Sequence, residues 1–279
     1  MTKKSIKTLC ILLFSLLFFV VSVLVTLSIG ETAADDSWEH VYPTYAKQDI
    51  SPLLQKSTLS DDEYQTLYSQ TGLTKKGIDD LLQTGNTVQI LSIQTAFFKK
   101  QTVNCRKFAP FTHTEEIYGY MPLTQLKNGD VLVSSSMHVS FLRYGHAALV
   151  VDAEIGLVLE IAQLNSLSGY DYANDFCDRA NFMVLRPNLP QELVNQVVEN
   201  AKTNLMGIPY DATVGVLSKK FSPEPIGTQC AHLVWYAYQC FGVDLDSDGG
   251  AVVRPKDIAN SPYLDVIQVF GFDLEKLWK

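Results

Sequence analysis

Cysteine is scarce in this chain of 279 residues, and its spacing excludes several classes of protein. The five cysteines are Cys10, Cys105, Cys177, Cys230 and Cys240. They form no two C-x-x-C pairs, which excludes a zinc site of that type. On one helix, Cys230 and Cys240 would lie about 15 Å apart along the axis, too far for a disulfide. Cys105 with Cys177 is the one pairing that we consider, so this is not a disulfide-stapled scaffold.

Positive charge is also in short supply. The chain has 22 Lys and Arg residues against 30 Asp and Glu residues, a net charge of −8. Lys3, Lys4 and Lys7 precede an apolar run, and the remainder carries 19 basic against 30 acidic side chains, about −11. Binding to phosphates needs a basic surface, so nucleic acid is excluded as a partner.

Internal repeats and low-complexity tracts are absent, but one long apolar run is present. The stretch "TLCILLFSLLFFVVSVLVTLSIG", residues 8–30, carries no charge. It is long enough to span a bilayer and longer than the apolar core of a signal peptide. We predict an uncleaved signal anchor over residues 1–30, with cleavage near "IGETAA" as the alternative. Because the lysines precede the run, we expect a single-pass cell-membrane protein with an extracytoplasmic domain, secreted if the segment is cleaved.

Residues 31–122 predict an extracytoplasmic spacer and a helical accessory segment. The spacer covers residues 31–56. Ser60 and Glu63 form a capping-box pattern that opens a first helix. Three short helices are expected, over residues 60–72, 74–82 and 90–99. We favour a packing role for these helices over that of a lid or a wall of a substrate site.

The pattern changes over residues 123–279. Short β-type runs are separated by Gly, Asn, Asp and Pro. They are "GDVLVS" (129–134), "HAALVVD" (146–152), "LVLEIA" (157–162), "NFMVLRP" (181–187) and "LDVIQVF" (264–270). Two helical patterns, over residues 190–207 and 230–242, accompany them. The prediction is an α+β fold with an antiparallel sheet packed against helices.

Cys230 is the candidate nucleophile. The turn "GTQ" precedes it, so that Cys230 begins the second of these helices. Backbone N–H groups and the positive end of the helix dipole favour the thiolate, the nucleophilic form of the side chain. The same N–H groups can stabilise an oxyanion. The alternative is that a free cysteine serves only as a small buried apolar side chain. That interpretation suits Cys240, which lies late on the helix in an apolar setting, better than Cys230, which has polar neighbours.

His146 is the candidate base. A thiolate nucleophile needs a base and a group that orients it. Three of the other histidines lie in segments predicted to be irregular: His40, His113 and His138. His232 follows Cys230 by two residues, and side chains at that spacing do not face each other on a helix, so we interpret it as a helix-surface residue.

Glu160 is the candidate orienting group, because an unpaired carboxylate inside an apolar strand is costly. "VDAEIGLVLE" predicts a hairpin between the strands of His146 and Glu160. A three-residue connection places the two on one face of the sheet, and a two-residue loop places them on opposite faces. The alternative is an edge residue facing water, with Asp152 and Gln163 as substitute orienting groups.

Six motifs in a fixed order carry a family resemblance. They are "GDVLVSSS", "GHAALVVD", "VLEIA", "GIPYDATV", "QCAHLVWYAYQCFGVDL" and "VRPKDIANSPYLDVI". Together they resemble the NlpC-type papain-like cysteine hydrolases, in the circularly permuted branch called YiiX/YebB-like. The resemblance implies a Cys–His–polar triad, mapped onto Cys230, His146 and Glu160. It also implies cleavage of an amide or related acyl bond through a thioester.

Two further residues are assigned to the pocket or the oxyanion site. Tyr210 in "GIPYD" matches a family tyrosine near the site, and Gln229 directly precedes the nucleophile. The chain departs from the family where its helix begins Cys-Ala-His instead of Cys-Ser-Glu, which bears on substrate preference.

The function expected is therefore a membrane-anchored cysteine hydrolase (a thiol protease or amidase) acting on cell-wall peptides. A lipid or acyl-amide hydrolase or acyltransferase is the second hypothesis. A non-catalytic binding module is the third, and the complete Cys–His–Glu set argues against it. We expect no metal and no organic cofactor.

Overall fold

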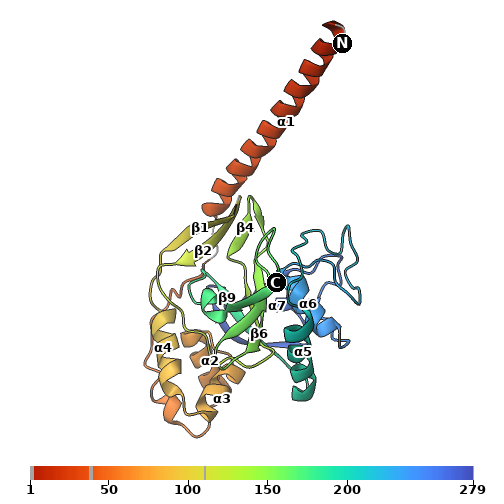
Figure 1. Ribbon diagram of the computed structural model, residues 1–279. Helices are drawn as coiled ribbons and strands as arrows, with labels where there is room; N and C mark the ends of the chain where they lie inside the picture. Colours follow the sequence, from red (N-terminus) through yellow and green to blue (C-terminus); the bar gives the residue numbers. More distant parts are fainter. Residues whose placement is uncertain (1–2, 38–39, 110, 279) are drawn as a thin grey trace.

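The computed structural model describes residues 3–37, 40–109 and 111–278. Residues 1–2, the start of the predicted anchor, lie outside this part. Helix α1 (Lys3–Asp35) projects away from the rest of the chain (Figure 1). It is long and apolar enough to cross a membrane, a test that an N-terminal signal sequence also passes. The apolar run thus forms one continuous helix, which extends past the predicted end at Gly30.

A six-stranded antiparallel sheet forms the centre of the fold and confirms the predicted α+β class. Its order is β10 (Leu264–Phe270), β9 (Phe182–Pro187), β3 (Val131–Ser134), β6 (His146–Asp152), β7 (Leu157–Glu160) and β8 (Gly169–Tyr172). The five predicted strands all belong to this sheet. Only β8 was not expected, and its residues alternate between half-buried and exposed positions.

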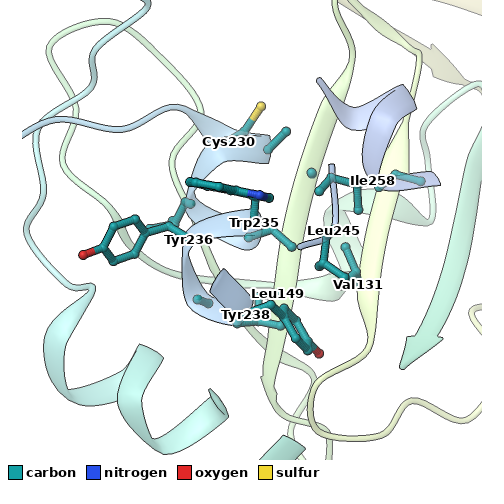
Figure 2. Close-up of a cluster of buried hydrophobic side chains, with 14 of the residues drawn as sticks. Val131, Leu149, Cys230, Trp235, Tyr236, Tyr238, Leu245 and Ile258 are labelled. Atoms are coloured by element: carbon teal, nitrogen blue, oxygen red, sulfur yellow. The ribbon is translucent and has the colours of Figure 1, made fainter. Parts of the chain in front are cut away.

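Three helices cover one face of the sheet: α5 (Gln191–Asn204), α6 (Cys230–Gln239) and α7 (Pro255–Ala259). Figure 2 shows the core that they share with the strands, where Trp235 and Tyr238 of α6 lie near Val131 and Leu149. The Tyr238 hydroxyl donates a 2.6 Å hydrogen bond to the Gly129 carbonyl. Helix α6 is buried along most of its length, which holds its first residue in a constant position against the sheet.

The accessory helices cover the opposite face (Figure 1). They are η1 (Leu53–Gln55), α2 (Asp61–Thr71), α3 (Lys75–Gln83) and α4 (Thr87–Phe97), and the short η2 (Ala173–Phe176) lies on the same side. The predicted capping box is present, because Ser60 and Glu63 bond to each other's backbone N–H groups. Gly72 ends α2 with φ +72°. These helices share a core with the sheet, as the packing interpretation expects.

Part of the predicted spacer packs on the domain. The Val41 N–H donates to the Gly271 carbonyl at 2.8 Å, the Gln48 N–H donates to Gln70 Oε1 at 2.7 Å, and Ile50 is fully buried. Residues 31–35 belong to α1.

A second antiparallel sheet was not expected from the sequence. Its order is β1 (Val103–Ala109), β2 (Thr112–Ile117), β4 (Met137–Val139) and β5 (Leu142–Arg143). Its strands come from both sides of the predicted domain boundary at residue 122. The prediction that His113 and His138 lie in irregular segments is wrong, since they lie on β2 and β4. Strands as polar as "THTEEI" lack apolar alternation, and their pairing depends on tertiary contacts.

Candidate active site

Cys230 is the first residue of α6, as predicted, and it is 2% exposed. Gln229 is the N-cap, and its side-chain oxygen accepts a 3.0 Å hydrogen bond from the Ala231 N–H. Its Nε2 donates to the Val253 carbonyl at 2.5 Å, and the Cys230 sulfur lies 3.4 Å from Gln229 Oε1. The Gln229 amide therefore orients the nucleophile and the first turn. In Figure 2 the sulfur points away from the labelled core side chains.

His146 and Glu160 lie on adjacent strands and bond to each other. His146 Nε2 and Glu160 Oε2 are 2.6 Å apart. The pairs Leu149–Leu159 and Val150–Val158 set a register in which the two side chains lie diagonally on one face. That register depends on a β-bulge between Val150 and Asp152. If the pairing of Asp152 with Leu157 next to the turn continued along the strands without the bulge, His146 and Glu160 would lie on opposite faces of the sheet.

The charge state of this pair follows from its surroundings. Burial lowers the pKa of His146, but the Glu160 charge and hydrogen bonds with Cys230 and Glu160 raise it to about 9. Burial raises the pKa of Glu160, and the His146 charge and hydrogen bond outweigh this and hold it below its usual value. Below about pH 9 the pair is therefore an imidazolium bonded to a carboxylate.

The other imidazole nitrogen of His146, Nδ1, is not used by Glu160. Nδ1 is buried and has no hydrogen-bond partner among the described residues, and the Cys230 side chain contributes to raising the pKa of the ring. The ring stacks on Phe176 with centroids 5.8 Å apart, which limits its rotation. Cys230, His146 and Glu160 are thus brought together in the order that a thiol–imidazole–carboxylate relay needs.

Two tyrosines lie within electrostatic reach of Cys230. Burial and then the charge of the Cys230 side chain raise the pKa of both Tyr210 and Tyr144. Tyr210 is held by a bridge to Thr228, directly before the nucleophile turn. Tyr144 was missed from the sequence, where its only signal was its position two residues before His146.

Arg179 was also missed, and no sequence pattern pointed to it. Its guanidinium is buried, with Cζ 4.7 Å from the centre of the Phe176 ring. Its Nε and Nη1 have no hydrogen-bond partner among the described residues. Its charge lowers the pKa of both Glu160 and His146. Arg179 therefore helps to keep Glu160 ionised.

A cavity of about 270 Å³ lies next to Glu160, between the two sheets. Arg179 and Glu160 line it. Most other lining side chains with polar groups are charged or amide-bearing: Arg106, Glu116, Gln163, Asp171, Asp175 and Asp178. The cavity is thus polar, with more acidic than basic groups.

Two expectations about neighbouring residues are wrong. His232 is not on the helix surface: it is 2% exposed, and its ring nitrogens bond to Thr228 Oγ1 at 2.8 Å and to the Lys220 carbonyl at 2.7 Å. Cys240 is not buried, because it follows the last residue of α6 and is exposed. All five cysteines lie among the described residues as free thiols, so Cys105 and Cys177 are not bridged.

Comparisons with protein-family models, curated proteins and solved structures find no match to this chain. The class that the molecule itself defines is an α+β protein with an N-terminal apolar helix, two antiparallel sheets and a buried Cys–His–Glu arrangement.

Proposed function

We propose that this chain is a membrane-anchored cysteine hydrolase of the permuted papain-like type, cleaving an amide bond in cell-wall peptides through a thioester. The observation that carries the proposal is the buried 2.6 Å bond between His146 and Glu160 beside Cys230 at the start of α6. The six motifs that resemble the NlpC-type hydrolases support it. The position of Lys3, Lys4 and Lys7 before the apolar helix supports an extracytoplasmic domain.

The proposed reaction has two steps. The Cys230 thiolate attacks the carbonyl carbon, the carbon–nitrogen bond breaks, and the His146 imidazolium gives its proton to the leaving amine. Neutral His146 then takes a proton from water, whose oxygen attacks the thioester; the carbon–sulfur bond breaks, which releases the carboxylic acid and restores the Cys230 thiolate beside the His146 imidazolium. Glu160 holds the imidazole and stabilises its charged form. Backbone N–H groups at the start of α6 stabilise the oxyanion, and Tyr210 borders the pocket.

The polar cavity beside Glu160 favours a peptide over a lipid substrate. Its charged lining suits a substrate that carries ionised groups. One observation keeps a lipid or acyl-amide substrate as the second candidate: Leu217 and Ile226, on the loop before the nucleophile, are 81% and 80% exposed. A binding module is the third candidate and predicts no turnover.

The test is a search for the acyl-enzyme on the full chain in detergent micelles. We would incubate it with soluble wall peptides or with phospholipid and N-acyl-amide vesicles, and follow both products and covalent adducts by mass spectrometry. We expect peptide cleavage and an acyl adduct on Cys230. Cys230→Ser and His146→Ala should each reduce turnover by a factor of 10³ or more, and Glu160→Gln by about 10–10², by analogy with the loss of relay groups.

Cys240→Ser is the matched control, since it removes an exposed thiol at the other end of the same helix and should leave turnover unchanged. Cleavage of lipids alone would favour the second candidate. Normal turnover by Cys230→Ser would refute the mechanism, and ligand binding without turnover in the wild type would favour a binding module.

A further inference from the structure

A second cluster of ionisable side chains lies on the small sheet and contains none of the residues of the proposed reaction. Register places Lys107, His113, His138 and Arg143 in one row across its four strands. The next row contains the Cys105–Glu115 pair on the same face. His113 and His138 face each other with ring centroids 5.6 Å apart. Five of these six side chains are ionisable groups that the proposed reaction does not use, and the sixth, Cys105, is a free thiol.

The C-terminal end of α1 covers this row. Asp35 Oδ1 lies 2.6 Å from His113 Nδ1 and 3.2 Å from His138 Nε2. Glu31 Oε1 lies 2.7 Å from His113 Nε2. His138 is fully buried and His113 is 8% exposed, so the cluster is largely shielded from water.

The contacts of His138 show which of its nitrogens points toward Asp35. Its Nδ1 lies 3.0 Å from the Ser140 carbonyl, which can only accept, so Nδ1 carries the proton. Nε2, on the other side of the ring, lies 3.2 Å from a carboxylate oxygen of Asp35. Nε2 is buried and makes no hydrogen bond to the described residues. Nε2 and the Asp35 carboxylate are therefore aimed at one shared, buried position that a cation can occupy.

The donor set fits a metal ion. One ligand atom each from Asp35, His113 and His138 lies within 4.8 Å of the others, and Cys105 and Glu115 form a similar group with His138. Two imidazoles and a carboxylate are ligands that Zn²⁺ accepts in a tetrahedral site with a fourth position. Metal-binding histidines usually donate their other N–H to a carbonyl or carboxylate, and here Ser140 and Glu31 occupy those places.

We infer that Asp35, His113 and His138 bind a divalent transition-metal ion, with zinc the best fit, and that the ion ties the end of α1 to the small sheet. Water or the Cys105 thiolate supplies the fourth ligand. The opposite face of β2 contributes Thr114 and Glu116 to the cavity beside Glu160, so the ion would also fix one wall of that cavity.

The test is zinc binding by the full chain in detergent, purified without a histidine tag and treated with a chelator. We expect one equivalent of Zn²⁺ by calorimetry and elemental analysis, with a rise in Tm on zinc addition. Co²⁺ should give a visible spectrum typical of tetrahedral geometry, and an added thiolate charge-transfer band would assign Cys105 as the fourth ligand.

Single substitutions test whether the bound zinc lies at Asp35, His113 and His138 and not elsewhere on the chain. His138→Gln and Asp35→Asn should each weaken zinc binding at least tenfold and abolish the zinc-dependent rise in Tm. His40→Gln is the matched control, because His40 bonds to the Ala180 carbonyl outside the cluster. Cys230→Ala should still bind one equivalent of zinc.

Absence of stoichiometric zinc binding in the wild type would overturn the inference and leave protonated histidines as the cation. Binding that survives in both His138→Gln and Asp35→Asn, or that is lost only in Cys230→Ala, would overturn it as well. Asp35→Asn changes one side chain at the end of α1 without altering its size, so it keeps the test valid if His138→Gln fails to fold.

Discussion

Replacing Glu160 by glutamine removes the negative charge beside His146 while keeping a side chain of nearly the same shape. In the native chain the pKa of His146 is raised from 6.5 to about 9. That difference corresponds to a folding free energy on the order of 3 kcal/mol. The folded pKa exceeds the unfolded one, so this stabilisation is fully present below about pH 6.5 and is lost as the pH rises through about 9.

Without the carboxylate charge, burial of His146 and the charge of Arg179 both act to lower its pKa. We therefore expect the His146 pKa to fall by about 1–3 in Glu160→Gln. The pH-dependent part of the stability should fall with it, so that the variant and the wild type differ most at and below about pH 6.5 and converge above about pH 9.

The assay is an NMR titration of the full chain carrying ¹³Cε1-labelled histidine. The chain has five histidines, and His146→Gln assigns the relevant signal. Denaturant unfolding at pH 6.5 and at about pH 9.5 measures the stability difference. Glu154→Gln is the control, because Glu154 is an exposed carboxylate in the same hairpin. An unchanged His146 pKa in Glu160→Gln, or an equal fall in Glu154→Gln, would show that the carboxylate does not set the charge state.

Three further outcomes are expected. Arg179→Gln should raise the His146 pKa in the same titration, because it removes a neighbouring cation. Arg179→Lys keeps the charge and should leave the His146 pKa nearly unchanged. A lower His146 pKa in Arg179→Gln would contradict this expectation. Iodoacetamide should label Cys230 at neutral pH, and the labelling rate, followed by mass spectrometry, should fall at least tenfold in His146→Ala. Equal labelling rates in the two proteins would mean that the imidazole does not activate the thiol. Gly72→Ala should destabilise the fold by on the order of 1–3 kcal/mol, because φ is +72° and the new Cβ would overlap a carbonyl of β10. Gly85→Ala, with φ +69° and open space around its Cβ among the described residues, should cost less in the same denaturant unfolding, and equal costs would argue against the overlap.

The accessory helices bear on the site through the sheet that they cover. The Val269 N–H donates to the Gly72 carbonyl at 2.8 Å, which ties the end of α2 to β10. Phe176 belongs to the core on this side and stacks on His146. The segment before residue 123 therefore packs on the sheet that carries His146, while Phe176, from the later part of the chain, contacts the imidazole itself.

Local patterns in the sequence were sufficient for several features of this protein. Short, largely apolar runs predicted β6 and β10 with their correct ends, because both strands are buried over most of their length on the two faces of the sheet. The polar turn before Cys230 predicted a helix start there. Ser60 and Glu63 predicted a capped helix, because a capping box depends only on residues four apart or fewer.

Other features were decided only by tertiary structure. The bulge between Val150 and Asp152 decides which face Glu160 shares with His146, and hairpin sequences do not specify where one extra residue is accommodated. Arg179 approaches Glu160 through the fold, with no local pattern to mark it. The polar strands of the small sheet, and the meeting of Asp35 with His113 and His138 upon it, require segments about 80 to 100 residues apart to pack together. Local propensity contains no information about such contacts, because their energy arises only when the chain has folded.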